Sequence, residues 1–157
     1  MTPIRDLTDL NRRIREAVLD DFETVVSLGL RFAREGPYAR LPITESSIRS
    51  LAAWMFAHGA ILFTEKHGQP VGMVGVACLP HMLTGRLYGA EVFWWCNPEA
   101  RGHGLRLVKA AEQWAKEHGA ETMQLVAPTE EVERLYTKLG YIQLETAYEK
   151  DLLCRPA

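Results

Sequence analysis

The stretch EVFWWCNPEARGHGLRL, from Glu91 to Leu107, decides how this chain folds. Its first part continues an apolar, aromatic run that predicts a strand over residues 87–96, ended by Asn97 and Pro98. A turn that contains glycine follows and opens a helix expected to start near Gly102. Backbone N–H groups at a helix start point outward, and the helix dipole favours negative charge there. This order of strand, turn and helix therefore has the geometry of an anion site.

The residues of the turn suit a phosphate. Gly102 and Gly104 let the backbone approach a bulky anion without interference from a Cβ atom, and Arg101 and Arg106 add positive charge. A strand, turn and helix that bind no ligand can carry the same pattern. The wider sequence has to decide between the two.

Upstream of this stretch, periodicity and turn residues predict two helices and three strands. Asp20 and Glu23 resemble a capping box, and Thr44 can cap a second helix whose apolar stripe is Ile48, Leu51, Ala52, Met55 and Phe56. The predicted elements are an edge strand over 13–17, helices over 20–35 and 44–59, and strands over 60–65 and 71–78 joined at His67 and Gly68.

Downstream, the helix that starts near Gly102 should end at Gly119. We expect its inner side to carry Leu105, Val108, Ala111, Ala115 and His118. A strand over 122–126, a helix that begins at 128–131 and ends at Gly140, and a final strand over 141–148 follow. The predicted order β-α-α-β-β-β-α-β-α-β is that of a mixed α/β sheet.

Bulk properties narrow the class of protein. The 157 residues suit one domain, which we place at 12–157 after a polar tail at 1–11. The formal charge of −2 argues against nucleic acid or an anionic membrane as the main partner. The start of the chain lacks the apolar run of a signal peptide, no membrane span is expected, and three cysteines without CxxC spacing suggest reduced thiols. We therefore expect a cytoplasmic protein, and the scattered histidines indicate no metal.

Two motifs in this element order resemble those of the GNAT acetyltransferases. Arg101 and Gly104 fit the first and fourth positions of the family's Arg/Gln-x-x-Gly-x-Gly/Ala motif, and the sequence from Arg134 to Tyr141, RLYTKLGY, is similar to Leu-Tyr-x-Lys-Leu-Gly-Phe. The resemblance extends from about Arg13 to Leu152. It implies a single-domain, mixed, mostly antiparallel sheet flanked by helices, with a splayed pair of strands that holds acyl-CoA.

The resemblance also implies roles for individual residues. Tyr136 would protonate the leaving thiolate, and Glu91 would deprotonate the amine directly or through water. The strand around Trp94, Trp95 and Cys96 would splay from its neighbour and pair with pantetheine. The backbone N–H groups that would hold the CoA pyrophosphate belong to Arg101, Gly102, His103, Gly104, Leu105 and Arg106.

Two positions depart from the family pattern. Arg106 stands where glycine or alanine is usual, and Thr129 replaces a helical asparagine often seen seven residues before the tyrosine. The Arg106 side chain either crowds the pyrophosphate or turns outward and pairs with a phosphate. An arginine at a helix start is mildly unfavourable by itself, and a bound anion would offset this cost. Since a guanidinium is also well suited to phosphate, we expect the second outcome.

Most of these residues also admit a purely structural interpretation. Glu91 can be a solvent-facing strand carboxylate, and Tyr136 can be core packing on an apolar helix stripe. We expect Cys96 to be a packed thiol and His103 to be a solvent-exposed turn residue. Trp94 and Trp95 should point to opposite faces of the sheet. The segment with Pro37, Tyr38 and Leu41 lies where the family usually gates its acceptor, or is a plain loop.

The function that the resemblance implies is that of an acyl-CoA-dependent N-acyltransferase, with acetyl-CoA or another acyl-CoA as co-substrate and no metal. The alternatives are a non-catalytic acyl-CoA-binding module and a protein-interaction module on the same fold. The sequence does not identify the amine acceptor, which could be a small molecule or a peptide, and it leaves a homodimer open.

Overall fold

The computed structural model describes residues 12–100 and 102–153. The chain divides into two compact units, one over Met1–Val126 and one over Ala127–Ala157. The predicted tail at 1–11 and the motif residue Arg101 lie outside the described residues. In the described part of the chain, every helix is too short or too polar to cross a membrane.

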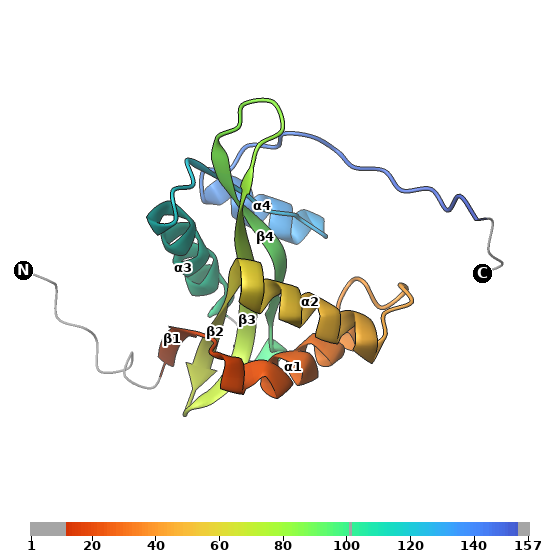
Figure 1. Cartoon of the computed structure of the whole chain (residues 1–157), viewed down its shortest axis with the longest axis vertical. Helices are drawn as coiled ribbons and strands as arrows, with labels where there is room; N and C mark the ends of the chain where they lie inside the picture. Colours follow the sequence, from red (N-terminus) through yellow and green to blue (C-terminus); the bar gives the residue numbers. More distant parts are fainter. Residues whose placement is uncertain (1–11, 101, 154–157) are drawn as a thin grey trace, which may run out of the picture. The chain divides into compact units, whose positions relative to one another are not determined.

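The first unit is built on a five-stranded sheet in the order β1-β2-β3-β4-β5 (Figure 1). Neighbouring strands are antiparallel except for the last pair, β4 and β5, which is parallel. The strands are β1 (Arg12–Glu16), β2 (Gly59–Lys66), β3 (Gln69–Pro80), β4 (Leu87–Cys96) and β5 (Thr122–Gln124). The mixed, mostly antiparallel sheet expected from the sequence is confirmed.

The turn between β2 and β3 is the predicted hairpin. His67 and Gly68 have φ angles of 53° and 74°, and Lys66 pairs with Gln69 across the turn. Left-handed backbone at both central residues gives a two-residue loop whose twist matches that of the strands.

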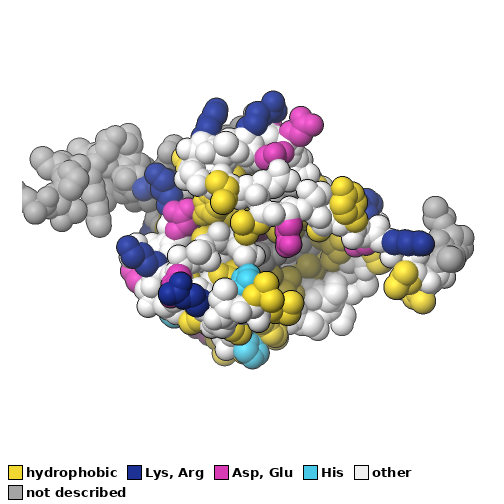
Figure 2. All heavy atoms as spheres, turned by 90° about the horizontal axis from the view of Figure 1, so that it is seen from above, with side chains coloured by type: hydrophobic (Ala, Val, Ile, Leu, Met, Phe, Trp, Pro, Cys, Tyr) yellow, Lys and Arg dark blue, Asp and Glu magenta, His cyan; other side chains and the backbone are white. Residues whose placement is uncertain are grey.

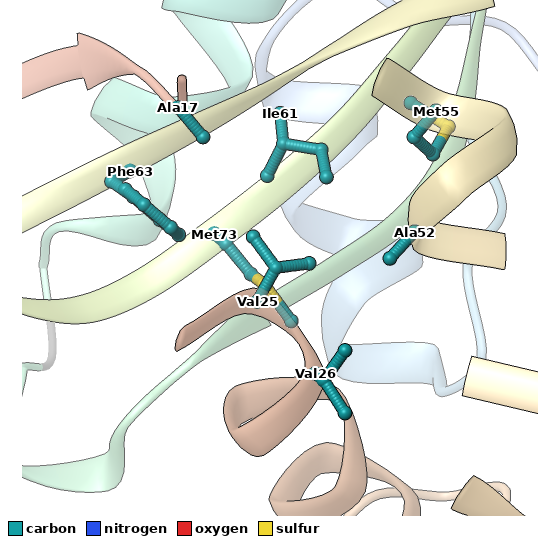
Figure 3. Close-up of a cluster of buried hydrophobic side chains, with 8 residues drawn as sticks. All are labelled: Ala17, Val25, Val26, Ala52, Met55, Ile61, Phe63 and Met73. Atoms are coloured by element: carbon teal, nitrogen blue, oxygen red, sulfur yellow. The ribbon is translucent and has the colours of Figure 1, made fainter. Parts of the chain in front are cut away.

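One face of the sheet is covered by α1 (Phe22–Glu35) and α2 (Glu45–His58). Thr44 caps α2 as expected, because its Oγ1 accepts from the Ser47 N–H at 3.1 Å while Ser47 Oγ accepts from the Thr44 N–H at 3.0 Å. The cluster in Figure 3 joins the two helices to the strands, and its buried members are Ala17, Val25, Val26, Ala52, Met55, Ile61, Phe63 and Met73. The predicted stripe of α2 packs against this cluster.

The start of α1 differs from the prediction. A 3₁₀ turn over Leu19–Asp21 precedes it, and Asp21 rather than Asp20 takes the cap position, without a side-chain cap bond. The Asp21 carboxylate instead accepts from the Val18 N–H at 2.8 Å and from the Arg15 guanidinium at 2.7 and 2.9 Å. The Asp21 carboxylate is therefore bound by the Arg15 guanidinium of β1 and does not cap α1.

The opposite face of the sheet is covered by α3 (Gly104–Glu117). Its buried residues are Leu107, Val108, Ala111 and Ala115, so Leu107 takes the place expected for Leu105, and His118 is exposed. These residues pack on Ala60, Leu62, Val74 and Val76 of the sheet. The helix starts two residues later than predicted, so Leu105 lies in its first turn, and Leu107, one turn before Ala111, is the first buried residue of the inner face.

The second unit contains α4 (Glu130–Lys138), capped by Thr129, whose Oγ1 accepts from the Val132 N–H at 3.4 Å. The strand predicted over 141–148 is wrong, because residues 141–150 form neither helix nor strand. Alternating apolar residues specify the two faces of a strand but not its neighbour. In the described part of this unit no second strand offers a ladder partner.

Charged side chains of both signs are interspersed on the face that Figure 2 displays. The described residues hold no group of three or more His, Cys, Asp or Glu side chains that could bind a metal ion.

Candidate active site

The strands β4 and β5 form a fork. Their parallel ladder covers three pairs only, from Tyr88 with Thr122 to Ala90 with Gln124. Beyond Ala90, β4 continues on β3 to Cys96, and no described residue pairs with its other edge. We call this opening, between β4 from Glu91 onward and residues 125–126, the β4–β5 fork. An edge without a ladder partner among the described residues can take an extended ligand as an added strand.

A β-bulge lies at the base of the fork. Val76 of β3 faces Glu91, while the preceding Gly75 faces Phe93, so Val92 is the extra residue on β4. A bulge bends its strand and redirects the side chains beside it. Glu91 Oε2 accepts a hydrogen bond from the backbone N–H of Val126, at 3.1 Å, on the other side of the fork.

Burial raises the pKa of the Glu91 carboxyl above its usual value, and the hydrogen bond from Val126 partly opposes this effect. Tyr38, between α1 and α2, interacts with the same charge. Its phenol has a raised pKa, mainly because it is desolvated and secondarily because Glu91 is negative. The Tyr38 ring packs edge-on against Phe32, with ring centroids 5.9 Å apart. A carboxylate with a raised pKa is suited to accept a proton.

The turn before α3 provides backbone donors. Gly102 has a φ angle of 92°, a left-handed conformation that favours glycine. The N–H of His103 donates to Ala100 O, and the N–H of Arg106 donates to His103 O, both at 3.1 Å. The N–H groups of Gly102, Gly104 and Leu105 donate to no acceptor in the described part of the chain. Three of the predicted N–H donors are thus available to an anion.

His103 is not the solvent-exposed turn residue that we expected. Its side chain is only 3% exposed, and Nδ1 lies 3.2 Å from the hydroxyl of Thr64, which is itself buried in β2. His103 therefore links the turn before α3 to β2 through a buried hydrogen bond. Movement of the turn would break this bond and leave both polar groups buried without it, which is unfavourable.

Trp94 and Trp95 point to opposite faces, as predicted. Trp94 packs with the cluster beneath α3, and a Cβ atom on Gly104 would lie 2.7 Å from its ring. Gly104 is therefore required by the indole as well as by any ligand. Trp95 is buried on the other face, where the guanidinium carbon of Arg31 lies 5.5 Å from its ring centroid.

Cys96 behaves as the packed thiol that was predicted. Its sulfur donates to the Ala100 carbonyl at 3.7 Å, and burial raises its pKa to about 11. A thiol with this pKa is almost entirely protonated at neutral pH and is a poor nucleophile.

Three further predicted residues lie on helices. Arg106 is partly buried in the first turn of α3, and Leu105 precedes it there. Tyr136 lies on α4 in the second unit, where its ring centroid is 5.7 Å from that of Tyr141.

Two partners in this site were not predicted. Thr64 had a detectable signal, since it is a polar residue of β2 that directly follows the apolar run Ile61 to Phe63. The Val126 N–H had none, because a backbone donor leaves no trace in the residue type. The bulge at Val92 is equally hidden, since it depends on how β3 and β4 are paired.

The sequence matches a known family over most of its length. The model of the acetyltransferase (GNAT) family matches residues 23–141, which include the fork, the glycine turn and α4. This chain belongs to the GNAT acetyltransferase family. The comparison with curated proteins gives no match.

Solved GNAT structures share the fold at low sequence identity. A Clostridium acetobutylicum protein described as a predicted acetyltransferase and solved with acetyl-CoA has a TM-score of 0.75 at 20% identity, covering 90% of this chain and 97% of its own. A ribosomal-protein-alanine N-acetyltransferase from Brucella melitensis has a TM-score of 0.72 at 19% identity, with 90% and 99% covered.

A third similar structure is the aminoglycoside N-acetyltransferase AAC(6')-Iy in complex with CoA. Its TM-score is 0.71 at 15% identity, and the alignment covers 98% of this chain and 100% of the other. At these identities the likeness concerns the fold.

Proposed function

We propose that this GNAT protein is an N-acyltransferase that transfers an acetyl or closely related acyl group from acyl-CoA to an amine, by direct attack in a ternary complex. The observation that supports the proposal is that one strand, β4, connects two features suited to an acyl-CoA. Its edge at the fork has no ladder partner among the described residues, and it leads into a turn with three available N–H donors.

The chain's residues would divide the binding of acyl-CoA between them. The N–H groups of Gly102, Gly104 and Leu105 would donate to the pyrophosphate, with the dipole of α3 favouring its negative charge. The edge of β4 beyond Ala90 would pair with pantetheine, which fits an extended amide-containing chain. Acyl-CoA supplies the acyl group and the thiolate leaving group.

The chemistry requires one proton to be removed and one to be supplied. Glu91 would accept a proton from the ammonium, and the free amine would then attack the thioester carbonyl carbon. As the C–S bond breaks, the thiolate takes a proton, for which the family motif nominates Tyr136. A backbone N–H of β4 would polarise the carbonyl oxygen, and binding both substrates together supplies proximity.

The acceptor is proposed to be a small-molecule amine or a peptide amine. One similar structure is named as an aminoglycoside acetyltransferase and another as a ribosomal-protein-alanine acetyltransferase. These names correspond to a small-molecule acceptor and to a protein acceptor. The segment with Pro37, Tyr38 and Leu41 would form the acceptor side, because Tyr38 interacts with the charge of Glu91. We also assign the acyltransferase domain to residues 12–157 and its location to the cytoplasm.

Thermal unfolding with acetyl-CoA tests the binding step. A ligand at one hundred times its dissociation constant adds about 2.7 kcal/mol, which corresponds to roughly 5 to 10 °C for a chain of this size. Adenosine is the control, since it lacks the pyrophosphate and pantetheine. No shift at millimolar acetyl-CoA would contradict the co-substrate assignment.

Release of free CoA thiol against a panel of amines then tests the reaction. We expect turnover with at least one primary amine. A thermal shift without turnover on any amine would favour a non-catalytic acyl-CoA-binding module, and the absence of both would favour a protein-interaction module.

A further inference from the structure

A side chain, that of Glu91, bridges the fork at its base. β4 and β5 separate after Ala90 and Gln124, yet the carboxylate of Glu91 reaches the N–H of Val126 at 3.1 Å, two residues beyond the end of β5. This contact links the two arms where no ladder pair does.

We propose that the backbone N–H of Val126 is a positioning group for Glu91, holding its carboxylate across the β4–β5 fork in the orientation from which it takes the acceptor's proton. The proposal rests on the proposed function, because it concerns the base of that reaction. It assigns a role in the reaction to the chain segment that leaves β5, a segment without any catalytic side chain of its own.

Three features of the surroundings support a specific contact. β3 presents only the apolar Val76 opposite Glu91, the segment between α1 and α2 presents Tyr38, and the far arm presents the Val126 N–H. Tyr38 is uncharged at neutral pH, since its pKa is raised. A partly buried carboxylate favours a donor, and among these three neighbours Val126 is the one whose hydrogen bond to it is observed.

The bulge explains how the contact is reached. In a regular strand Glu91 and Val92 would alternate across the sheet, but the extra residue re-aims the side chain next to it. Two features therefore orient the Glu91 carboxylate: the bulged backbone of β4 and the hydrogen bond from the Val126 N–H across the fork. A base fixed at both ends keeps one lone pair directed at Val126 and leaves its other oxygen for the incoming amine.

The hydrogen bond also favours the charged form of Glu91, against the effect of burial. A base works only when deprotonated, so the rate falls as the pH drops through its pKa. Loss of the Val126 donor should raise that pKa further and move the acid limb of the rate profile to higher pH.

Three variants separate the contact from the base. Val126→Pro deletes the donor, and because Val126 lies beyond β5 the proline removes no ladder hydrogen bond. Val126→Ala is its reference, since it shortens the same side chain and keeps the N–H. Glu91→Gln keeps an acceptor for Val126 but removes the base.

The first measurement is the pH dependence of kcat/KM for acetyl transfer. We expect the acid limb of Val126→Pro to lie a few tenths to about one pH unit above that of Val126→Ala. Its plateau rate should also be lower, because the carboxylate is no longer held in position. Coincident acid limbs for the two variants would overturn the proposal.

The second measurement needs no proline and reports on the contact itself. The Val126 amide proton of the parent, followed by NMR, should shift with pH with a midpoint that matches the acid limb, and this titration should vanish in Glu91→Gln. A Val126 amide that does not titrate would overturn the proposal even where Val126→Pro fails to fold.

Failure of the proposed function has a different signature. Absence of acyl transfer by the parent protein contradicts that function, and the amide titration then still decides whether the contact exists. Full parental activity of Glu91→Gln at every pH would show that Glu91 is not the base and would overturn the inference as well.

Discussion

At the scale of single residues, Glu91 is subject to opposing demands. Its partly buried position disfavours the carboxylate, while the chemistry proposed for it requires the carboxylate. A group whose pKa is raised by folding adds stability below its unfolded pKa, and this contribution is lost as the pH rises through the folded pKa. At neutral pH the charged form is therefore a cost to the fold.

Replacing Glu91 by glutamine should consequently stabilise the protein and inactivate it. We expect kcat/KM to fall roughly 10²- to 10⁴-fold, with the unfolding free energy at pH 8 raised above that of the parent and the gain disappearing in acid. Urea unfolding at two pH values measures the change in unfolding free energy, with a Glu145→Gln variant at an exposed position as control. A variant that is less stable than the parent at pH 8 would contradict this account.

Tyr136 poses a narrower question, because its hydroxyl is the part that the family motif assigns to proton transfer. Tyr136→Phe keeps the ring, so binding of acetyl-CoA should be retained while turnover falls about 10²- to 10⁴-fold. Tyr148→Phe is the matched control, since Tyr148 is 93% exposed. Equal turnover for the two variants, measured with chemistry rate-limiting, would leave Tyr136 with a packing role only.

At the scale of elements, β1, β2 and the turn before α1 are held together by one guanidinium. Arg15 bonds to both Asp21 and Glu65 and lies 5.1 Å from the centroid of the Phe63 ring. The Arg15 guanidinium holds the pKa of Asp21 below its usual value. The stabilisation from Asp21 is thus present above its unfolded pKa and is lost as the pH falls through the folded pKa.

Arg15→Ala should cost about 1 to 3 kcal/mol of unfolding free energy, because it leaves two partly buried carboxylates without their cation. Arg86→Ala is the control. Its ion pair with Glu121 is mostly exposed, so the cost should stay below about 1 kcal/mol. Denaturant unfolding at neutral pH compares them, and equal costs would mean that the Arg15 cluster is no stronger than a surface pair.

The first turn of α3 carries the departure from the family motif. We expect the Arg106 side chain to contact a phosphate, so Arg106→Ala should weaken acetyl-CoA binding roughly 3- to 10-fold, with a smaller loss at high salt. Lys109→Ala, an exposed cation on the same helix, should have a weaker effect. Calorimetry at two ionic strengths measures both variants, and tighter binding by Arg106→Ala would instead indicate that the arginine obstructs the site.

Elements with strong local signals were predictable from the sequence. The bounds of β4 and the Thr44 cap of α2 follow from an apolar run and a capping residue. The strand at 141–148 failed, because pairing depends on a neighbour elsewhere in the chain. The glycine turn before α3 and the place of Glu91 on β4 were predicted, while the burial of His103 was not, since its partner Thr64 is 39 positions away.

At the scale of the whole molecule, the two family motifs fall in different units. The glycine turn belongs to Met1–Val126, and the motif around Tyr136 belongs to Ala127–Ala157. The element order that links them is what made the resemblance specific, since each motif alone is short. The composition of the chain constrained its class but carried no information on the acceptor.

The three-pair ladder between β4 and β5 has a consequence for hydrogen exchange. In an antiparallel strand successive amides point to alternate sides. Along β4 from Phe93 to Cys96, past the bulge at Val92, amides bonded to β3 should therefore exchange slowly with deuterium, while those facing the fork should exchange fast. Acetyl-CoA should slow the second set and leave the first unchanged. Uniform protection along this stretch without ligand would mean that the two sides of the fork pair in solution. Alternating protection would instead allow the exchange rate of each β4 amide to show whether a ligand has added a strand.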